Sequence, residues 1–119
     1  MALTQATIYG RYALETLRAA DLRIAMATVD LFDDTAERRI VRMLRVHAPD
    51  RATLETRTLT GYDAERNRWT HYGPGRGVDV EGRAAVRAMV RAMLAEVDAA
   101  KLTPSVHNSG AHESFYRET

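Results

Sequence analysis

The feature of this sequence that most constrains its fold is a one-sided apolar pattern over residues 82–101. Aliphatic and methionine side chains recur there at spacings of three and four residues, which puts them on one face of an α-helix. Thr103-Pro104 follows, and proline disfavours a helical conformation in the residue before it. The pattern therefore predicts a helix that ends before this proline. The residues of its apolar face are Val86, Met89, Val90, Met93, Leu94 and Val97.

The segment in front of this helix alternates as β-strands do. Threonine is frequent between residues 52 and 60, and it favours extended backbone. Pro49 and Asp50 favour a turn, and the glycine-rich run 73–77 predicts a sharp bend. The expected elements are a strand over 39–47, a turn at 48–51, a strand over 52–60, a polar turn over 61–68, a short strand over 69–72, the bend, and a brief strand at 78–80.

The two ends of the chain differ from this middle. Residues 8–32 carry leucine, methionine and valine at helical spacings and predict a largely helical N-terminal segment within 1–37. The stretch 29–32 also fits the beginning of a strand, and the sequence leaves this alternative open. Residues 105–119 are polar, with few large aliphatic side chains, and predict a flexible tail.

Together these elements predict an α+β fold in one domain over 1–104. Its parts are a small antiparallel sheet of three to four strands over 38–80, a long C-terminal amphipathic helix and the helical N-terminal segment. A length of 119 residues with 45% apolar content allows one modest core. Since a small core poor in aromatic residues often gains stability from a partner, we expect a homodimer.

Several kinds of function have no support in the sequence. There is no cysteine, which excludes disulfides and thiolate metal sites. His71, His107 and His112 lack the spacing of a zinc site, and no serine lies in a nucleophile-elbow motif. We therefore expect no metal, no cofactor and no catalytic residue. The sequence shows neither a targeting pattern nor an 18-residue apolar stretch, which predicts a cytoplasmic protein without a membrane partner.

Positive charge is concentrated in the middle of the chain. Residues 38–76 contain nine arginines and four acids, whereas residues 1–37 sum to −3 and residues 77–119 to −1. Cationic strands with interleaved aromatic rings suit single-stranded nucleic acid, because arginine contacts phosphates and rings stack on exposed bases. The candidate contacts are Arg42, Arg45, Arg57, Arg68 and Arg76 for phosphates, and Trp69 and Tyr72 for bases, with Tyr62 as a further ring.

Each of these residues also has a simpler explanation. Trp69 would pack against the helix, and the arginines would form a solvated outer face of the sheet. Arg83, Arg87 and Arg91 lie four residues apart, so they form one stripe along the helix. This stripe is either a solvated face or a second track for phosphates.

The order of these features is similar to that of a known family. The chain resembles the domain of the positive-cofactor-four type transcriptional coactivators over residues 38–101, although the family's second basic residue in the bend is missing. The resemblance implies a curved antiparallel sheet with one helix per subunit, dimerisation through the 82–101 helices, and binding of single-stranded DNA on the sheet. It rests on Tyr62-Asp63, Pro74-Gly75-Arg76-Gly77, Val78-Asp79-Val80 and the helix after Gly82.

The resulting hypothesis is a non-enzymatic single-stranded nucleic-acid-binding protein, an accessory of transcription or replication. The alternative is a small protein-binding accessory or inhibitor, of the mobile-element or phage type, that acts on a host protein complex. A third class, a small-ligand enzyme that uses His71, requires a pocket with converging polar groups.

Overall fold

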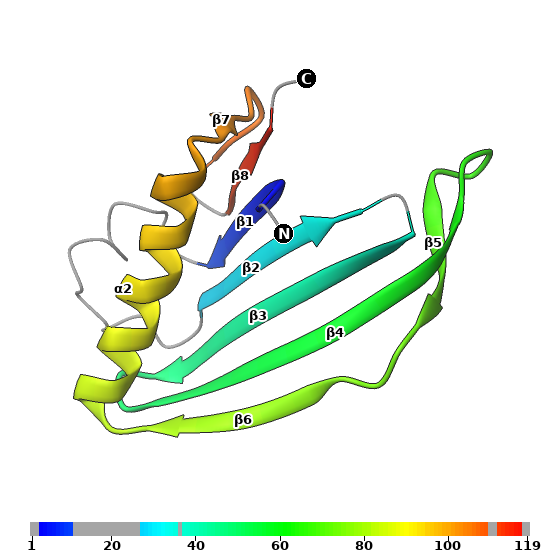
Figure 1. The fold of residues 1–119 in the computed structure, drawn as a ribbon. Helices are drawn as coiled ribbons and strands as arrows, with labels where there is room; N and C mark the ends of the chain where they lie inside the picture. The colour runs from blue at the N-terminus through cyan, green and yellow to red at the C-terminus, as the bar shows by residue number, and fades with distance from the viewer. Residues whose placement is uncertain (1–2, 11–26, 36, 110–111, 118–119) are drawn as a thin grey trace.

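One antiparallel sheet extends through the structure, and an α-helix lies across one of its faces (Figure 1). The computed structural model describes residues 3–10, 27–35, 37–109 and 112–117. In chain order, these residues form β1 (Gln5–Gly10), β2 (Ala27–Asp34), β3 (Arg38–Ala48), β4 (Arg51–Asp63), β5 (Arg68–Tyr72), β6 (Arg76–Glu81), α2 (Arg83–Ala100), β7 (Thr103–Pro104) and β8 (His112–Tyr116).

The strands follow the order β5-β4-β3-β2-β1-β8-β7 across the sheet, and β6 pairs with β4 as well. β6 runs along residues 51–56 of β4, and β5 runs along residues 59–63. These two short strands therefore form one interrupted edge. Gly73 lies at the interruption, where its N–H donates to the Thr58 carbonyl at 2.8 Å.

The main core lies between α2 and one face of the sheet. The spacing of its apolar residues gives α2 a continuous buried stripe, which packs on side chains from β1, β2, β3, β4 and β8. Directly opposed residues of an antiparallel pair share a face, so the strand register defines this helix face. The buried residues are Val86, Val90, Met93, Leu94 and Val97 of α2, with Ala6, Ile8, Val29, Leu31, Leu44, Val46, Ala52 and Phe115 of the sheet.

A second, smaller apolar cluster lies on the opposite face. Val41 and Leu59 are buried there under Trp69, which the β4–β5 hairpin carries. Phe32 and Met43 pack against the three. Both faces of the central strands are therefore partly apolar.

The expected fold class is wrong in its proportions. Strands make up 57% of the described structure and the helix 19%, so a small sheet beside a long helix does not describe it. α2 lies near the expected 82–101 but is followed by two more strands. It ends at Lys101, which has a left-handed φ of 51°. In the part of the chain that the structure describes, no helix is long and apolar enough to cross a membrane.

The expected N-terminal helix is also wrong where the structure describes that segment. β1 and β2 occupy its two ends, residues 11–26 lie outside the described residues, and the alternative of a strand at 29–32 is confirmed. Val29 and Leu31 are buried on the helix face, while Phe32 packs on the opposite face. Because both faces carry apolar residues, the apolar–polar alternation typical of a strand is not visible in the sequence.

The expected flexible tail contains a strand. β8 lies between β1 and β7, and Phe115 is buried in the main core. One aromatic side chain anchors this strand, so the scarcity of aliphatic residues there does not indicate disorder.

Gly61 is a position in β4 where a side chain would be strained. Its φ is +70°, and an added Cβ would lie 2.3 Å from Thr70 Oγ1. We expect Gly61→Ala to lower the free energy of unfolding by about 1–2 kcal/mol, because L-residues rarely adopt this conformation. Urea denaturation measures the loss. Gly77→Ala is the control, since its added Cβ meets the nearest atom at 3.7 Å. Equal losses in both variants would contradict this explanation.

Candidate functional site

The arginines expected to contact nucleic acid do not share one surface. Arg42 and Arg76 both pair with Thr56 and lie on the face that α2 covers. Arg45 and Arg57 alternate with the core residues of β3 and β4 and lie on the opposite face. The strands therefore do not bring these four side chains together.

Two of these arginines are held by carboxylates. Arg42 forms an ion pair with Glu96 of α2, with 3.1 Å between Nη2 and Oε2. Arg57 Nη2 lies 3.0 Å from Oε1 of Glu55 on the same strand. All four side chains are partly exposed, so each pair contributes little to stability. Each pair nevertheless offsets a charge that was expected to meet a phosphate.

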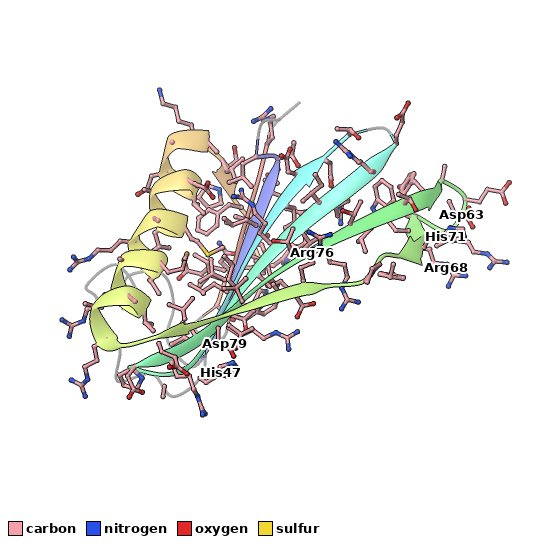
Figure 2. All side chains as sticks on the ribbon, turned by 60° about the horizontal axis from the view of Figure 1, so that its bottom comes forward. His47, Asp63, Arg68, His71, Arg76 and Asp79 are labelled. Atoms are coloured by element: carbon pink, nitrogen blue, oxygen red, sulfur yellow. The ribbon has the colours of Figure 1, made fainter. Side chains whose placement is uncertain are left out.

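The remaining three predicted residues, Arg68, Trp69 and Tyr72, belong to the β4–β5 hairpin, whose tip is seen with Arg68 in Figure 2. Arg68 is exposed, and Tyr72 is 64% exposed. Trp69 is only 9% exposed, and its ring centre lies 5.3 Å from that of Tyr62. It packs on the face opposite α2, not against the helix. The ring therefore offers little exposed surface for stacking on a base.

Arg39 lies beside these rings, although the sequence pattern does not single it out. Its guanidinium carbon lies 5.4 Å from the centre of the Phe32 ring and 5.8 Å from that of Trp69. Both carboxylate oxygens of Asp34 accept hydrogen bonds from it, at 2.6 and 2.8 Å. Asp34 and Arg39 flank the turn between β2 and β3, and an acid and an arginine on either side of a turn are the signal that could have revealed this cross-strand pair.

A cavity of about 430 Å³ opens beside this cluster. Arg39, Asp34 and Trp69 line it, together with Tyr62 and other polar residues. Its charged groups already bind each other, and His71 is not among the lining residues. The cavity therefore gives no support to a small-ligand enzyme that uses His71.

Among the described strand residues, those on the opposite face carry no net positive charge. Strand register places four arginines and five acids there, so the acids of neighbouring strands outnumber the arginines. The arginines are Arg39, Arg45, Arg51 and Arg57, and the acids are Asp30, Asp34, Glu55, Asp79 and Glu81.

The helix side, in contrast, is basic. We define it as α2 with Lys101, the strand residues that register places on the helix face, and Arg117, which lines a cavity with Arg42 and Glu96. Eight cations and four acids lie on this side. The cations are Arg38, Arg42, Arg76, Arg83, Arg87, Arg91, Lys101 and Arg117, and the acids are Asp33, Glu96, Asp98 and Glu113.

The stripe of Arg83, Arg87 and Arg91 is the most uncompensated part of the helix side. All three side chains are exposed, and none has an ion-pair partner among the described residues. The first turn of α2 contains no acid. A cation in the first turn opposes the helix dipole by about 0.3–1 kcal/mol, and each like-charge pair four residues apart costs about 0.2–0.5 kcal/mol. A bound anion would offset these costs.

A polar chain of His47, Thr53 and Asp79 joins β3, β4 and β6 (Figure 2). His47 Nε2 lies 2.9 Å from Thr53 Oγ1, which donates to Asp79 Oδ1 at 3.4 Å. Because the hydroxyl proton is directed at the carboxylate, the imidazole donates to the hydroxyl oxygen and does not act as its base. This exposed chain does not activate a nucleophile. No group of three or more His, Asp and Glu able to hold a metal occurs within residues 3–10, 27–35, 37–109 and 112–117.

Asp30 is a buried carboxylate on the opposite face. It is 8% exposed, and its Oδ1 has no hydrogen-bond partner. Thr7 lies directly across from it, but the Thr7 hydroxyl bonds to that of Ser114 at 3.3 Å. Burial raises the pKa of Asp30 from 3.8 to about 6, and the positive charge of Arg45 opposes this shift.

The chain matches no protein-family model, and neither a curated protein nor a solved structure is significantly similar to it. The resemblance to the coactivator family therefore stays a prediction. The apolar face of α2, through which that family would dimerise, is buried against the chain's own sheet.

Burial of Asp30 predicts a pH-dependent gain in stability when its charge is removed. The pKa of Asp30 is higher in the folded state than in the unfolded state, so burying its ionised carboxylate lowers the free energy of unfolding. This loss is absent below about pH 4 and fully present above about pH 6. We expect Asp30→Asn to raise the free energy of unfolding by about 1–3 kcal/mol near pH 7, with the gain vanishing toward about pH 4. Chemical denaturation over this range measures it.

The matched control is Glu65→Gln, because Glu65 is an exposed acid. Its stability should stay within about 0.5 kcal/mol of the parent at each pH. A gain in Asp30→Asn that does not change with pH would show that the cost does not come from the buried charge.

Proposed function

We propose that this protein is a non-enzymatic nucleic-acid-binding protein that holds a phosphate backbone on its helix side. The observation that carries the proposal is the asymmetry of charge: eight cations with four acids on the helix side, and four with five on the opposite face. Arginine forks onto phosphate oxygens, and each contact releases counterions from the nucleic acid. A cytoplasmic location belongs to the same proposal.

The stripe on α2 is the expected centre of this surface. Residues four apart rise by about 6 Å along a helix axis, so the three guanidinium groups form a regular track. Ala84 and Ala88 lie between them on the outer side of α2, and Ala95 lies one turn beyond the last of them. All three alanines are small and exposed, which leaves the track accessible.

Binding through this track rests on phosphates alone. Within the part of the chain that the structure describes, the exposed tyrosines and Trp69 lie elsewhere, so these rings add no base stacking on the helix side. Single-stranded nucleic acid remains the first ligand to test. A preference for single strands over duplexes is no longer expected, because no aromatic ring of the described residues lies beside the track to stack on exposed bases. We therefore expect weak, sequence-independent and strongly salt-dependent binding, to single strands and duplexes alike.

Fluorescence anisotropy with labelled oligonucleotides over a salt series tests the proposal. We expect the triple variant Arg83→Gln, Arg87→Gln, Arg91→Gln to lose about tenfold or more in affinity at low salt. The slope of log K against log salt should fall by about 2 for a single strand, since three phosphate contacts are removed. Glutamine keeps a good helix propensity, so α2 should remain folded.

The control is a second triple variant, Arg45→Gln, Arg51→Gln, Arg68→Gln. All three arginines are exposed: Arg45 and Arg51 lie on the opposite face, and Arg68 lies on the β4–β5 hairpin away from α2 (Figure 2), and the change in net charge is the same. Its affinity should change less than threefold or so, as expected for long-range charge alone. Absence of binding by the parent protein at low ionic strength would end the proposal, and equal losses in both variants would remove the role of the stripe.

A protein-binding accessory is the second candidate, and the opposite face favours it. Tyr9, Tyr72 and Tyr116 are exposed there among nearly balanced charges. Tyrosine and arginine are enriched at protein–protein interfaces, and a neutral face does not select a polyanion. A photo-cross-linking residue in place of Tyr72 should then form one protein adduct in cells, while the same residue in place of Arg87 should not. Equal adducts from both positions would contradict this candidate.

A further inference from the structure

Among the strands that the structure describes, none pairs with the outer edge of β6. β6 pairs with β4 on one side and with no other described strand on the other. Figure 1 shows that α2 begins at the end of β6 and runs away from this edge across the sheet, so it does not cover it. Val78 is 61% exposed. Such an edge offers its N–H and C=O groups to another strand, and it contains neither the proline nor the lysine that commonly protects an edge.

The register identifies which backbone groups of β6 are free. Gly82 continues the pairing of β6 with β4, and its N–H donates to the Asp50 carbonyl at 2.8 Å. Hydrogen-bonded and non-hydrogen-bonded positions alternate along an antiparallel pair. The even-numbered residues of β6, Val78 among them, therefore bond to β4. Gly77 and Asp79 direct their N–H and C=O groups outward.

We propose that two copies of this chain pair antiparallel through β6, about a twofold axis at Val78. Each Gly77 then faces Asp79 of the other copy, and every such pair exchanges two backbone hydrogen bonds through groups that β4 does not use. The two Val78 residues meet at a non-hydrogen-bonded position, with their Cα atoms about 4.5 Å apart. Two partly exposed valines are thereby removed from water. An isologous contact of this kind closes as a dimer.

Charge selects this register among those that a twofold axis allows. A centre at Asp79 would place two carboxylates directly opposite each other, which is unfavourable. A centre at Gly77 would extend the pairing beyond Arg76 into the bend, which is not a strand. With the axis at Val78, each Asp79 lies opposite a glycine, and no two like charges are directly opposed. The β6 edge of a second copy therefore matches this edge in both hydrogen bonding and charge.

This dimer does not depend on the proposed function and is tested by oligomeric state. Sedimentation velocity of the full chain over a concentration series should show a mass that rises from 13.3 kDa toward twice this value. We expect Val78→Lys to remain monomeric, because two ammonium groups would face each other. Val106→Lys is the matched control, since Val106 is 90% exposed and far from β6 in sequence, and it should dimerise as the parent does. A parent that stays monomeric into the millimolar range would overturn the proposal.

The register has its own test, because the chain contains no cysteine. A Val78→Cys variant should form a symmetric disulfide-linked dimer under mild oxidation, at least tenfold faster than Val106→Cys. Val80→Cys faces Arg76 of the other copy in the proposed pairing and should cross-link as slowly as the control. Rapid cross-linking of Val80→Cys, or equal rates for all three, would exclude an axis at Val78.

Discussion

The packing of α2 on the sheet is the interaction on which the rest of this structure depends. Five side chains of the helix are buried, and each contributes on the order of 1.5–3 kcal/mol relative to an exposed side chain. The helix uses its whole apolar face inside the subunit. Its outer face is left with alanine, arginine and the acids Glu96 and Asp98, which offer little apolar surface to a second helix. The same packing fixes which face of every strand is covered and which is open to a partner.

Clustering of charge along the sequence does not become clustering in space. Arginines that occupy odd and even positions of β3 point to opposite faces, so Arg42 and Arg45 separate although they are three residues apart. The neighbouring strands then add acids, since β2 brings Asp30 and Asp34 beside β3. The surplus of arginine in residues 38–76 is thereby spread over both faces of the sheet. The stripe of three arginines on α2, which have no ion-pair partner among the described residues, lies outside this segment.

The sequence predicts the elements whose local signals are strong. The three-to-four-residue period of α2 and the alternation in β3 and β4 depend on neighbouring residues, and both appear close to the expected bounds. Long-range pairing is not encoded in this way. β8 has few apolar residues and is a strand because β1 and β7 pair with it, and Phe115 inserts into the core. The burial of Trp69 is not predictable for a similar reason, since nothing near it in the sequence reveals Arg39, whose guanidinium lies over its ring, or the cluster with Val41 and Leu59.

The free edge and the basic side are connected by symmetry. A twofold axis perpendicular to the sheet leaves its faces unexchanged, so two copies joined through β6 present both helix sides in the same direction. Their positive charges then repel at low ionic strength, and an anionic polymer that spans both sides lowers this repulsion. Because binding to the proposed pair would also double the number of phosphate contacts, the free energy of nucleic-acid binding and that of dimerisation would support each other. The charge asymmetry would therefore increase the affinity for an anionic polymer more in the proposed pair than in a single copy.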